Sequence, residues 1–572
     1  TLPSVWIVSS IVFIVRLTLL LWIAFVERVG ASGVTLAEDR PPSRVRHMKA
    51  LAIPALLLAA LVGFADDKGK DPKPPAAKLP LGKDTTFVVG PLNKDGYIDY
   101  EAALNAEMSK GVTADTNANT LIIQAFGPAP EGGDGFPLEY YRWLDIQVLP
   151  KDGEYLVGIN AYVSGQLGLT GARLEAFYEA QSQITKRPWA AKDCTPMTEW
   201  LKLNDKPLAL VAEGVKRPHY FNPLVSNRKE GQGSNLIGSL LPSVQKCREL
   251  ASAFAARAML RLHDGKLDDA WLDLLTCHRL GRLVARGATL IEALVGIAIG
   301  QIAHQSTLAF VAHPDLTADR AKRCLKDLDG LPPLPSLADK LGVAERMMGL
   351  DALQNIRRAG PGADPLAGVI DGEVLFPDEP KAFEVLDWAA VMRTMNARYD
   401  RMEAAMRTKD RAARLKAFEK LEAELAARKK EFSDEAKLKK MMEGKDAGRR
   451  VGEALGEVLM SLLAPAVQKV NQAHDRATQA TANTRLAFAL AAHRRDAGRY
   501  PAKLADLAPK YLPAVPDDLF TGKPLVYKPD EKGYLLYSLG VDGKDDGGQT
   551  YGDDPPGDDL PVKMPPPPPK KN

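Results

Sequence analysis

Apolar residues recur at intervals of three and four along residues 243–335, the spacing that places them on one face of a helix. His263, Asp264 and Gly265 interrupt this pattern. Because a glycine at such a break lets the backbone turn, we expect a helical hairpin whose two arms meet there. The pattern therefore predicts a helical bundle region at residues 243–335.

Residues 289–312 form an apolar segment that is long enough for either a core helix or a membrane span. Its polar side chains include Glu292, Gln301 and His304. Such groups are costly in lipid, so we expect a buried helix of a folded core. Gly296 and Gly300 lie one turn apart and would let a neighbouring helix approach closely.

Charges of both signs alternate along residues 401–450. Opposite charges four residues apart support a solvated helix, each pair by a few tenths of a kcal/mol. We expect long charged helices within residues 336–481, entered through a loop-rich bridge at 336–380. A break and helix start are predicted at 432–435.

Residues 86–242 mix helical runs with β-like runs at 86–89 and 120–126 and with many glycines and prolines. We expect an irregular, mainly helical N-terminal domain. The stretch at 93–101 suggests a calcium-binding EF-hand, but placing Gly96 at loop position six puts Pro91 and Ala102 where acidic ligands are required. A turn leading into a helix at 100–109 fits better.

A secretory signal peptide is predicted at residues 48–65. Lys49 precedes a short apolar core, and Gly63 and Ala65 are the small residues before the expected cleavage point. Residues 66–85 are rich in proline, lysine and aspartate, which predicts a disordered linker. We therefore expect the chain beyond this point to be exported.

Residues 1–47 form an N-terminal extension with an apolar run at 5–26, interrupted by Arg16. Two interpretations remain open. Either Met48 is the true start of translation, or the run is a transmembrane helix that anchors the protein. In both cases we expect the mature chain outside the cytoplasmic membrane. With a start at Met48 the signal peptide exports it. With an anchoring helix the basic residues between the two apolar segments resist translocation and hold that loop in the cytoplasm.

The 75 basic and 72 acidic residues give a formal charge of +3, which argues against a nucleic-acid partner bound through a strong overall positive field. The four cysteines form no C-x-x-C pair. A disulfide between Cys247 and Cys277 is an alternative in an exported chain, but their helical spacing favours buried free thiols.

The central hairpin resembles one tetratricopeptide-like unit. Its small and apolar positions are Ala256, Leu260, Gly265, Leu267 and Ala270. An array would need further copies at a period of about 34 residues, and none follows. We expect a single hairpin within a larger bundle at residues 243–335.

Residues 482–562 predict a small α+β domain. A helix at 482–497 would end at Gly498 and Pro501, and strands would follow around residues 524–527 and 534–538. This order, with its Arg-Tyr-Pro exit and its final Ser-x-Gly-x-Asp-Gly motif, resembles the soluble domain of type II secretion major pseudopilins. The rest resembles uncharacterised exported bacterial proteins. Residues 563–572 predict a disordered proline-rich tail.

The pseudopilin resemblance implies a calcium ion bound by the loop after the last strand, with Asp542 of the motif as a ligand. Crowded carboxylates on a glycine-bent loop repel one another, and calcium accepts six to eight oxygens in flexible geometry. The predicted metal ligands are Asp542, Asp545, Asp546 and Asp553, with Asp554 as a further acidic neighbour. The alternative is a solvated acidic turn.

The eight histidines show no metal-ligand spacing, and the sequence has neither a nucleophile elbow nor a phosphate-binding loop. We predict no catalytic residue and no cofactor besides calcium. The expected protein is a mainly α, non-enzymatic scaffold or interaction module that meets protein partners in the cell envelope. Two alternatives stay open: a periplasmic hydrolase with a site around His219 or His304, and an accessory of a secretion or pilus machine.

Overall fold

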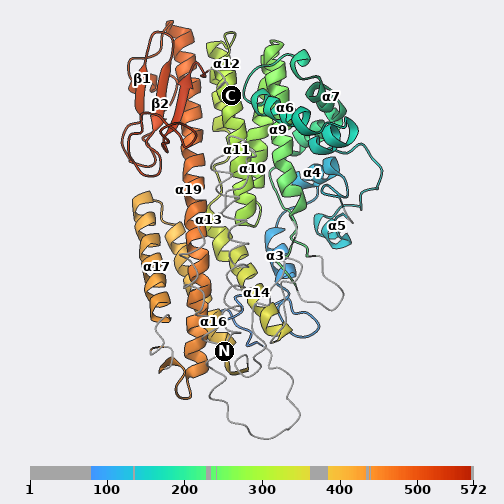
Figure 1. Cartoon of the computed structure of the whole chain (residues 1–572), viewed down its shortest axis with the longest axis vertical. Coiled ribbons are helices and arrows are strands. Elements are labelled where there is room, and N and C mark those ends of the chain that lie inside the picture. Colours follow the sequence, from blue (N-terminus) through green and yellow to red (C-terminus); the bar gives the residue numbers. More distant parts are fainter. Residues whose placement is uncertain are drawn as a thin grey trace.

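The computed structural model describes residues 79–567, apart from 133–134, 227–233, 240, 361–383, 433–436 and 438–439. The predicted N-terminal extension and signal peptide lie outside the described residues. Within them the chain is mainly helical, as predicted, and its long helices run along the longest axis of the molecule (Figure 1). The last part of the predicted linker is ordered, because Leu79 is buried and Asn396 binds the carbonyl oxygens of Asp84 and Thr85.

The centre is a helical bundle of α9 (Pro242–His263), α10 (Leu267–Val284), α11 (Leu290–Val311) and α12 (Ala318–Asp329). The turn between α9 and α10 contains Gly265 at φ +74°, so the predicted hairpin break is confirmed. The α11 helix is apolar and long enough for a membrane span, but most of it is buried against its neighbours, as predicted for a core helix. The four cysteines are buried free thiols.

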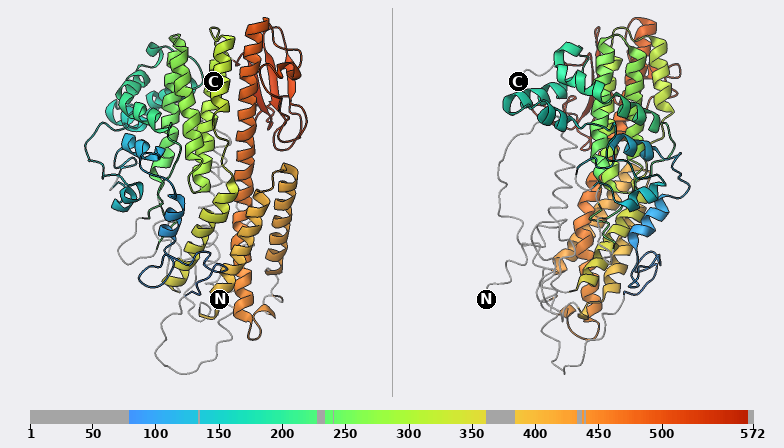
Figure 2. Two further views of the ribbon diagram at one scale, coloured as in Figure 1. Left: turned by 180° about the vertical axis from the view of Figure 1, so that it is seen from behind. Right: turned by 90° about the vertical axis from the view of Figure 1, so that its right-hand side faces the viewer.

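A single helix of 51 residues, α19 (Ala447–Ala497), runs along the whole molecule (Figures 1 and 2). The predicted domain boundary between residues 481 and 482 falls inside it. Its first part packs on α16 (Trp388–Met406) through Gly448, Gly452 and Gly456, where any Cβ atom would collide with α16 or the residues just before it. Its last part packs on α11, α12 and the C-terminal sheet.

The N-terminal region is helical and irregular, as predicted. Its α-helices are α3 (Tyr100–Met108), α4 (Ala118–Phe126), α5 (Leu138–Leu144), α6 (Gly171–Ile184), α7 (Thr195–Leu203) and α8 (Asp205–Gly214). The π-helix η3 (Ala161–Gln166) and the short 3-10 helix η4 (Ala191–Cys194) lie between them. The β-like run at 120–126 lies in α4, because Asn117 caps this helix and its apolar residues pack against α8 and the bundle. The helix after Asp99 is confirmed.

The predicted loop bridge is helical in its described part. After Ser336 the chain forms α13 (Leu337–Asp339), η5 (Lys340–Glu345) and α14 (Arg346–Ala359), whose buried apolar residues join the core around α16. Tertiary packing therefore overrides the loop-like composition. The charged helix α17 (Arg411–Phe432) follows α16, and most of the break predicted at 432–435 lies outside the described residues.

The C-terminal sheet is antiparallel, in the order β1 (Val526–Pro529), β2 (Tyr534–Ser538) and β3 (Leu560–Met564). The short turn η6 (Leu504–Leu507) links α19 to it. Strand β3 extends into the predicted disordered tail, because Lys563 pairs with Leu535 and Met564 with Tyr534. The sheet has no separate core: Leu536 and Val562 belong to the same buried cluster as Phe488 of α19 and the central bundle.

Candidate metal centre

The loop between β2 and β3 folds back so that its two ends meet. Gly540, just after β2, has a φ of +68°, and a Cβ atom there would collide with the backbone of Asp558. Gly543 has a φ of +69°. These left-handed positions, which glycine adopts without strain, turn the chain so that Asp542 lies beside Asp558, the residue two positions before β3.

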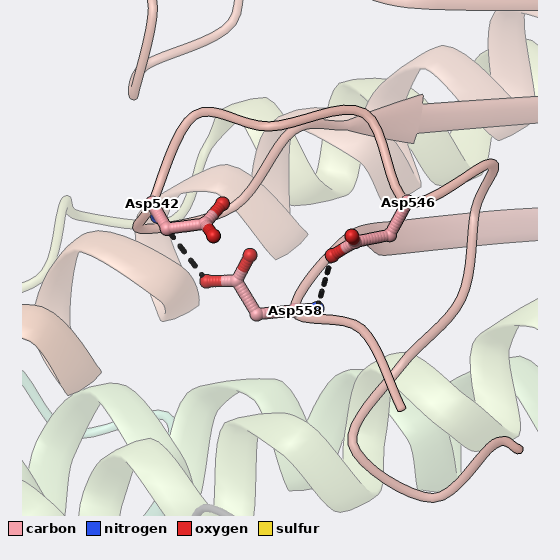
Figure 3. Close-up of side chains that lie close together, drawn as sticks. All are labelled: Asp542, Asp546 and Asp558. Atoms are coloured by element: carbon pink, nitrogen blue, oxygen red, sulfur yellow. Dashed lines mark hydrogen bonds between the residues drawn. The ribbon is translucent and has the colours of Figure 1, made fainter. Parts of the chain in front are cut away.

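Three carboxylates converge at this point. Asp542, Asp546 and Asp558 each offer an oxygen within 4.8 Å of the others, and Figure 3 shows Asp542 and Asp546 on either side of Asp558. The amide of Asp558 donates to Oδ2 of Asp546 at 2.9 Å. The arrangement concentrates negative charge on a short stretch of loop, which favours a cation.

Asp558 is the buried member of the group, with 8% of its surface exposed. Its Oδ2 accepts a hydrogen bond from the Val541 amide at 2.7 Å and lies 3.3 Å from Nη2 of Arg476 on α19. Its Oδ1 is buried and has no hydrogen-bond partner. Burial, and then the nearby charge of Asp542, raise the pKa of Asp558. Buried carboxylate oxygens are normally satisfied, so Oδ1 can accept a further partner.

Asp542 lies at the exposed edge of the group. The amide of Lys544 donates to its Oδ1 at 2.9 Å, and the Lys544 ammonium lies 3.0 Å from its Oδ2. These two hydrogen bonds lower the pKa of Asp542, so the carboxylate is ionised at neutral pH. An ionised carboxylate at the edge and a buried one beneath it are suited to holding a hard cation between them.

The structure brings only two of the four predicted ligands, Asp542 and Asp546, into this group. Asp545 accepts hydrogen bonds from the Tyr537 hydroxyl at 2.8 Å and from the Gly547 amide at 2.9 Å, and these bonds lower its pKa. Asp553 accepts from the amide and hydroxyl of Thr550, so it stabilises a turn. Neither belongs to the converging group.

Sequence reasoning missed Asp558. The signal that could have found it is the apolar alternation in Leu560–Met564: a third antiparallel strand there must return beside the end of β2. The residues just before such a strand then lie next to the start of the loop. No strand was predicted at 560–564, and the disordered tail was expected to begin at residue 563, so nothing placed Asp558 beside the start of the loop.

Neither His219 nor His304, the histidines of the alternative hydrolase hypothesis, belongs to the group of three carboxylates. His304 is buried in α11, where its two ring nitrogens lie 2.9 Å from the Thr484 hydroxyl and 3.3 Å from the Thr481 hydroxyl. Its ring packs edge-on against His278. His219 is exposed, and its backbone bridges to Asn117. Both nitrogens of His304 are thus engaged within the core.

Neither a protein-family model nor a curated protein nor a solved structure matches the chain.

Proposed function

We propose that this chain is a non-enzymatic, exported scaffold of the cell envelope whose C-terminal module is stabilised by a calcium ion. The observation that carries the calcium proposal is the buried, unpartnered Oδ1 of Asp558 beside Asp542 and Asp546. Calcium is the cation that best fits, because it takes carboxylate and main-chain oxygens in flexible geometry on a loop.

The ion would act on structure. It would join Asp542 and Asp546, in the first half of the loop, to Asp558, which leads into β3 and contacts Arg476 of α19. A bound ion would therefore hold the loop closed and fasten the sheet to the long helix. Three carboxylates brought together without an ion repel one another, so this closure would weaken on removal of calcium.

The scaffold proposal is supported by the architecture of the described residues. The α19 helix joins the central bundle, the charged helices and the sheet into one elongated body with shared buried clusters. The proposal that the C-terminal end is a pseudopilin-like module rests on the resemblance of its sequence motifs. We propose that the exposed helical faces bind protein partners in the cell envelope.

The test is the thermal unfolding of the full chain in calcium, in magnesium and in chelator. A ligand that binds only the folded state raises its stability, by about 2.7 kcal/mol at 100 times its dissociation constant. We expect calcium to raise the Tm and magnesium to raise it less, because magnesium demands stricter octahedral geometry.

Variants locate the effect. Asp558→Asn and Asp542→Asn should both lose the calcium-dependent rise in Tm. Asp542 is exposed, so its substitution does not disturb a buried position. Asp554→Asn removes an equal charge from an exposed position of the same loop and should keep the rise. Equal Tm values for the wild-type chain in calcium and in chelator would refute the calcium proposal. Turnover of ester, amide or glycoside substrates, abolished by substitution of His219, would refute the scaffold proposal.

A further inference from the structure

A second site lies where the charged helices meet the C-terminal module. A cavity of about 600 Å³ opens between the start of α17, the middle of α19 and the loop at residues 517–522. In Figure 1 this is the region where α17 approaches the lower side of the sheet beside α19. Cavities of this size at the junction of structural units commonly hold small molecules.

One wall of this junction cavity is cationic. Arg411 and Arg414 share a single carboxylate: Nε of Arg411 lies 3.0 Å from Oδ2 of Asp475, and Nη2 of Arg414 lies 2.8 Å from its Oδ1. Asp475 is 4% exposed. Two guanidinium groups against one carboxylate leave one positive charge uncompensated within this group. Lys409 lines the same cavity from its exposed side.

The same wall carries hydrogen-bond donors without partners. They are Nη2 of Arg411, Nε of Arg414 and Nδ2 of Asn471. Asn471 is 2% exposed, and all three residues line the cavity. Buried donors in folded proteins are nearly always paired, so unpaired N–H groups on three residues that line one cavity indicate a missing acceptor.

Three further carboxylates, those of Asp410, Asp517 and Asp518, line the cavity. Asp518 accepts from the Phe520 and Leu539 amides and from the Ser538 and Thr521 hydroxyls. Asp410 accepts from the Ala413 amide in the first turn of α17, and Asp517 is exposed.

We propose that the junction cavity binds a small molecule through an oxyanion, a carboxylate or a phosphate, seated against Arg411, Arg414 and Asn471. Planar guanidinium groups suit such oxygens, and the Asn471 amide supplies a further donor. The volume accommodates a metabolite-sized ligand. This proposal is independent of calcium, because none of its three residues belongs to the metal centre.

The experiment measures the binding of two probes, citrate and inorganic phosphate, to the full chain by calorimetry at constant ionic strength. Saturable binding of either is expected, and the preferred probe identifies the group as carboxylate or phosphate. Asn471→Asp adds a carboxylate of the protein's own to the cavity lining and should weaken binding at least tenfold. Gln472→Glu makes the same charge change at the next position of α19, outside the cavity, and should leave binding unchanged.

Asn471→Ala keeps the test decisive if Asn471→Asp does not fold. It removes the unpaired donor without adding charge and should weaken binding severalfold. Absence of saturable binding of both probes to the wild-type chain, or equal binding by Asn471→Asp and Gln472→Glu, would overturn the proposal.

Discussion

Two glycines of α11, Gly296 and Gly300, allow a matched test of close helix packing. A Cβ atom at Gly296 would lie 2.5 Å from the backbone nitrogen of Ala285 and 2.6 Å from the carbonyl oxygen of Gly281. Both atoms belong to the C-terminal end of α10. A Cβ atom at Gly300 would meet nothing within 4 Å. The two positions lie one turn apart in the same helix, so they differ in packing and share their helical context.

Two opposing contributions set the magnitude. Replacing a helical glycine by alanine stabilises by about 1 kcal/mol, because glycine loses more backbone entropy on folding. At Gly296 the added methyl group must push apart two helices whose backbone atoms cannot yield, and such overpacking costs about 1–3 kcal/mol. We expect Gly300→Ala to stabilise by up to about 1 kcal/mol and Gly296→Ala to destabilise by up to about 2 kcal/mol.

Urea unfolding of the full chain followed by far-UV circular dichroism measures the difference. Gly300→Ala should shift the midpoint to higher urea and Gly296→Ala to lower urea, with the slope of the transition unchanged in both. A Gly296→Ala chain as stable as Gly300→Ala would show that the interface of α10 and α11 relaxes freely. The explanation of this close approach would then be wrong.

Two further predictions concern buried charge. Burial lowers the pKa of His304 to about 3. The unfolded chain therefore takes up a proton below pH 6.5 that the folded chain does not, and the free energy of unfolding falls by about 1.4 kcal/mol per pH unit between pH 6.5 and pH 3. The stability advantage of the wild-type chain over His304→Gln in urea unfolding should shrink by about 2 kcal/mol from pH 7 to pH 5, and a constant difference would contradict the low pKa. Asp273 is 3% exposed and binds Arg257 and Arg261 at 2.8 and 2.7 Å, so Asp273→Asn should lower the free energy of unfolding by about 3 kcal/mol. The urea midpoint of this variant, compared with that of the exposed control Asp269→Asn, measures the loss. Equal midpoints would refute this magnitude.

The features that the sequence determined are local ones. The hairpin break at Gly265, the end of α19 at Gly498 and the helix after Asp99 follow from glycine conformation and helix capping, which depend on neighbouring residues. The core location of α11 follows from its composition. Asp542 was predicted from the Ser-x-Gly-x-Asp-Gly motif of the pseudopilin resemblance. Asp546 was predicted as an acidic neighbour on the same glycine-rich loop, which can be recognised without knowing where the loop lies.

Tertiary structure alone decided which distant segments meet. The β-like run at 120–126 became helix because its cap and packing partners outweighed its β-branched residues. Strand β3 formed at 560–564, reaching into the predicted tail, because β2 offered an edge with which it pairs. Asp558 reaches Asp542 only through that strand pairing, and Arg411, Arg414 and Asn471 share a cavity only because α17 packs on α19. Both candidate sites depend on contacts between residues far apart in the chain. Those contacts are stabilised by the burial of apolar surface between distant segments, which a local sequence pattern does not predict.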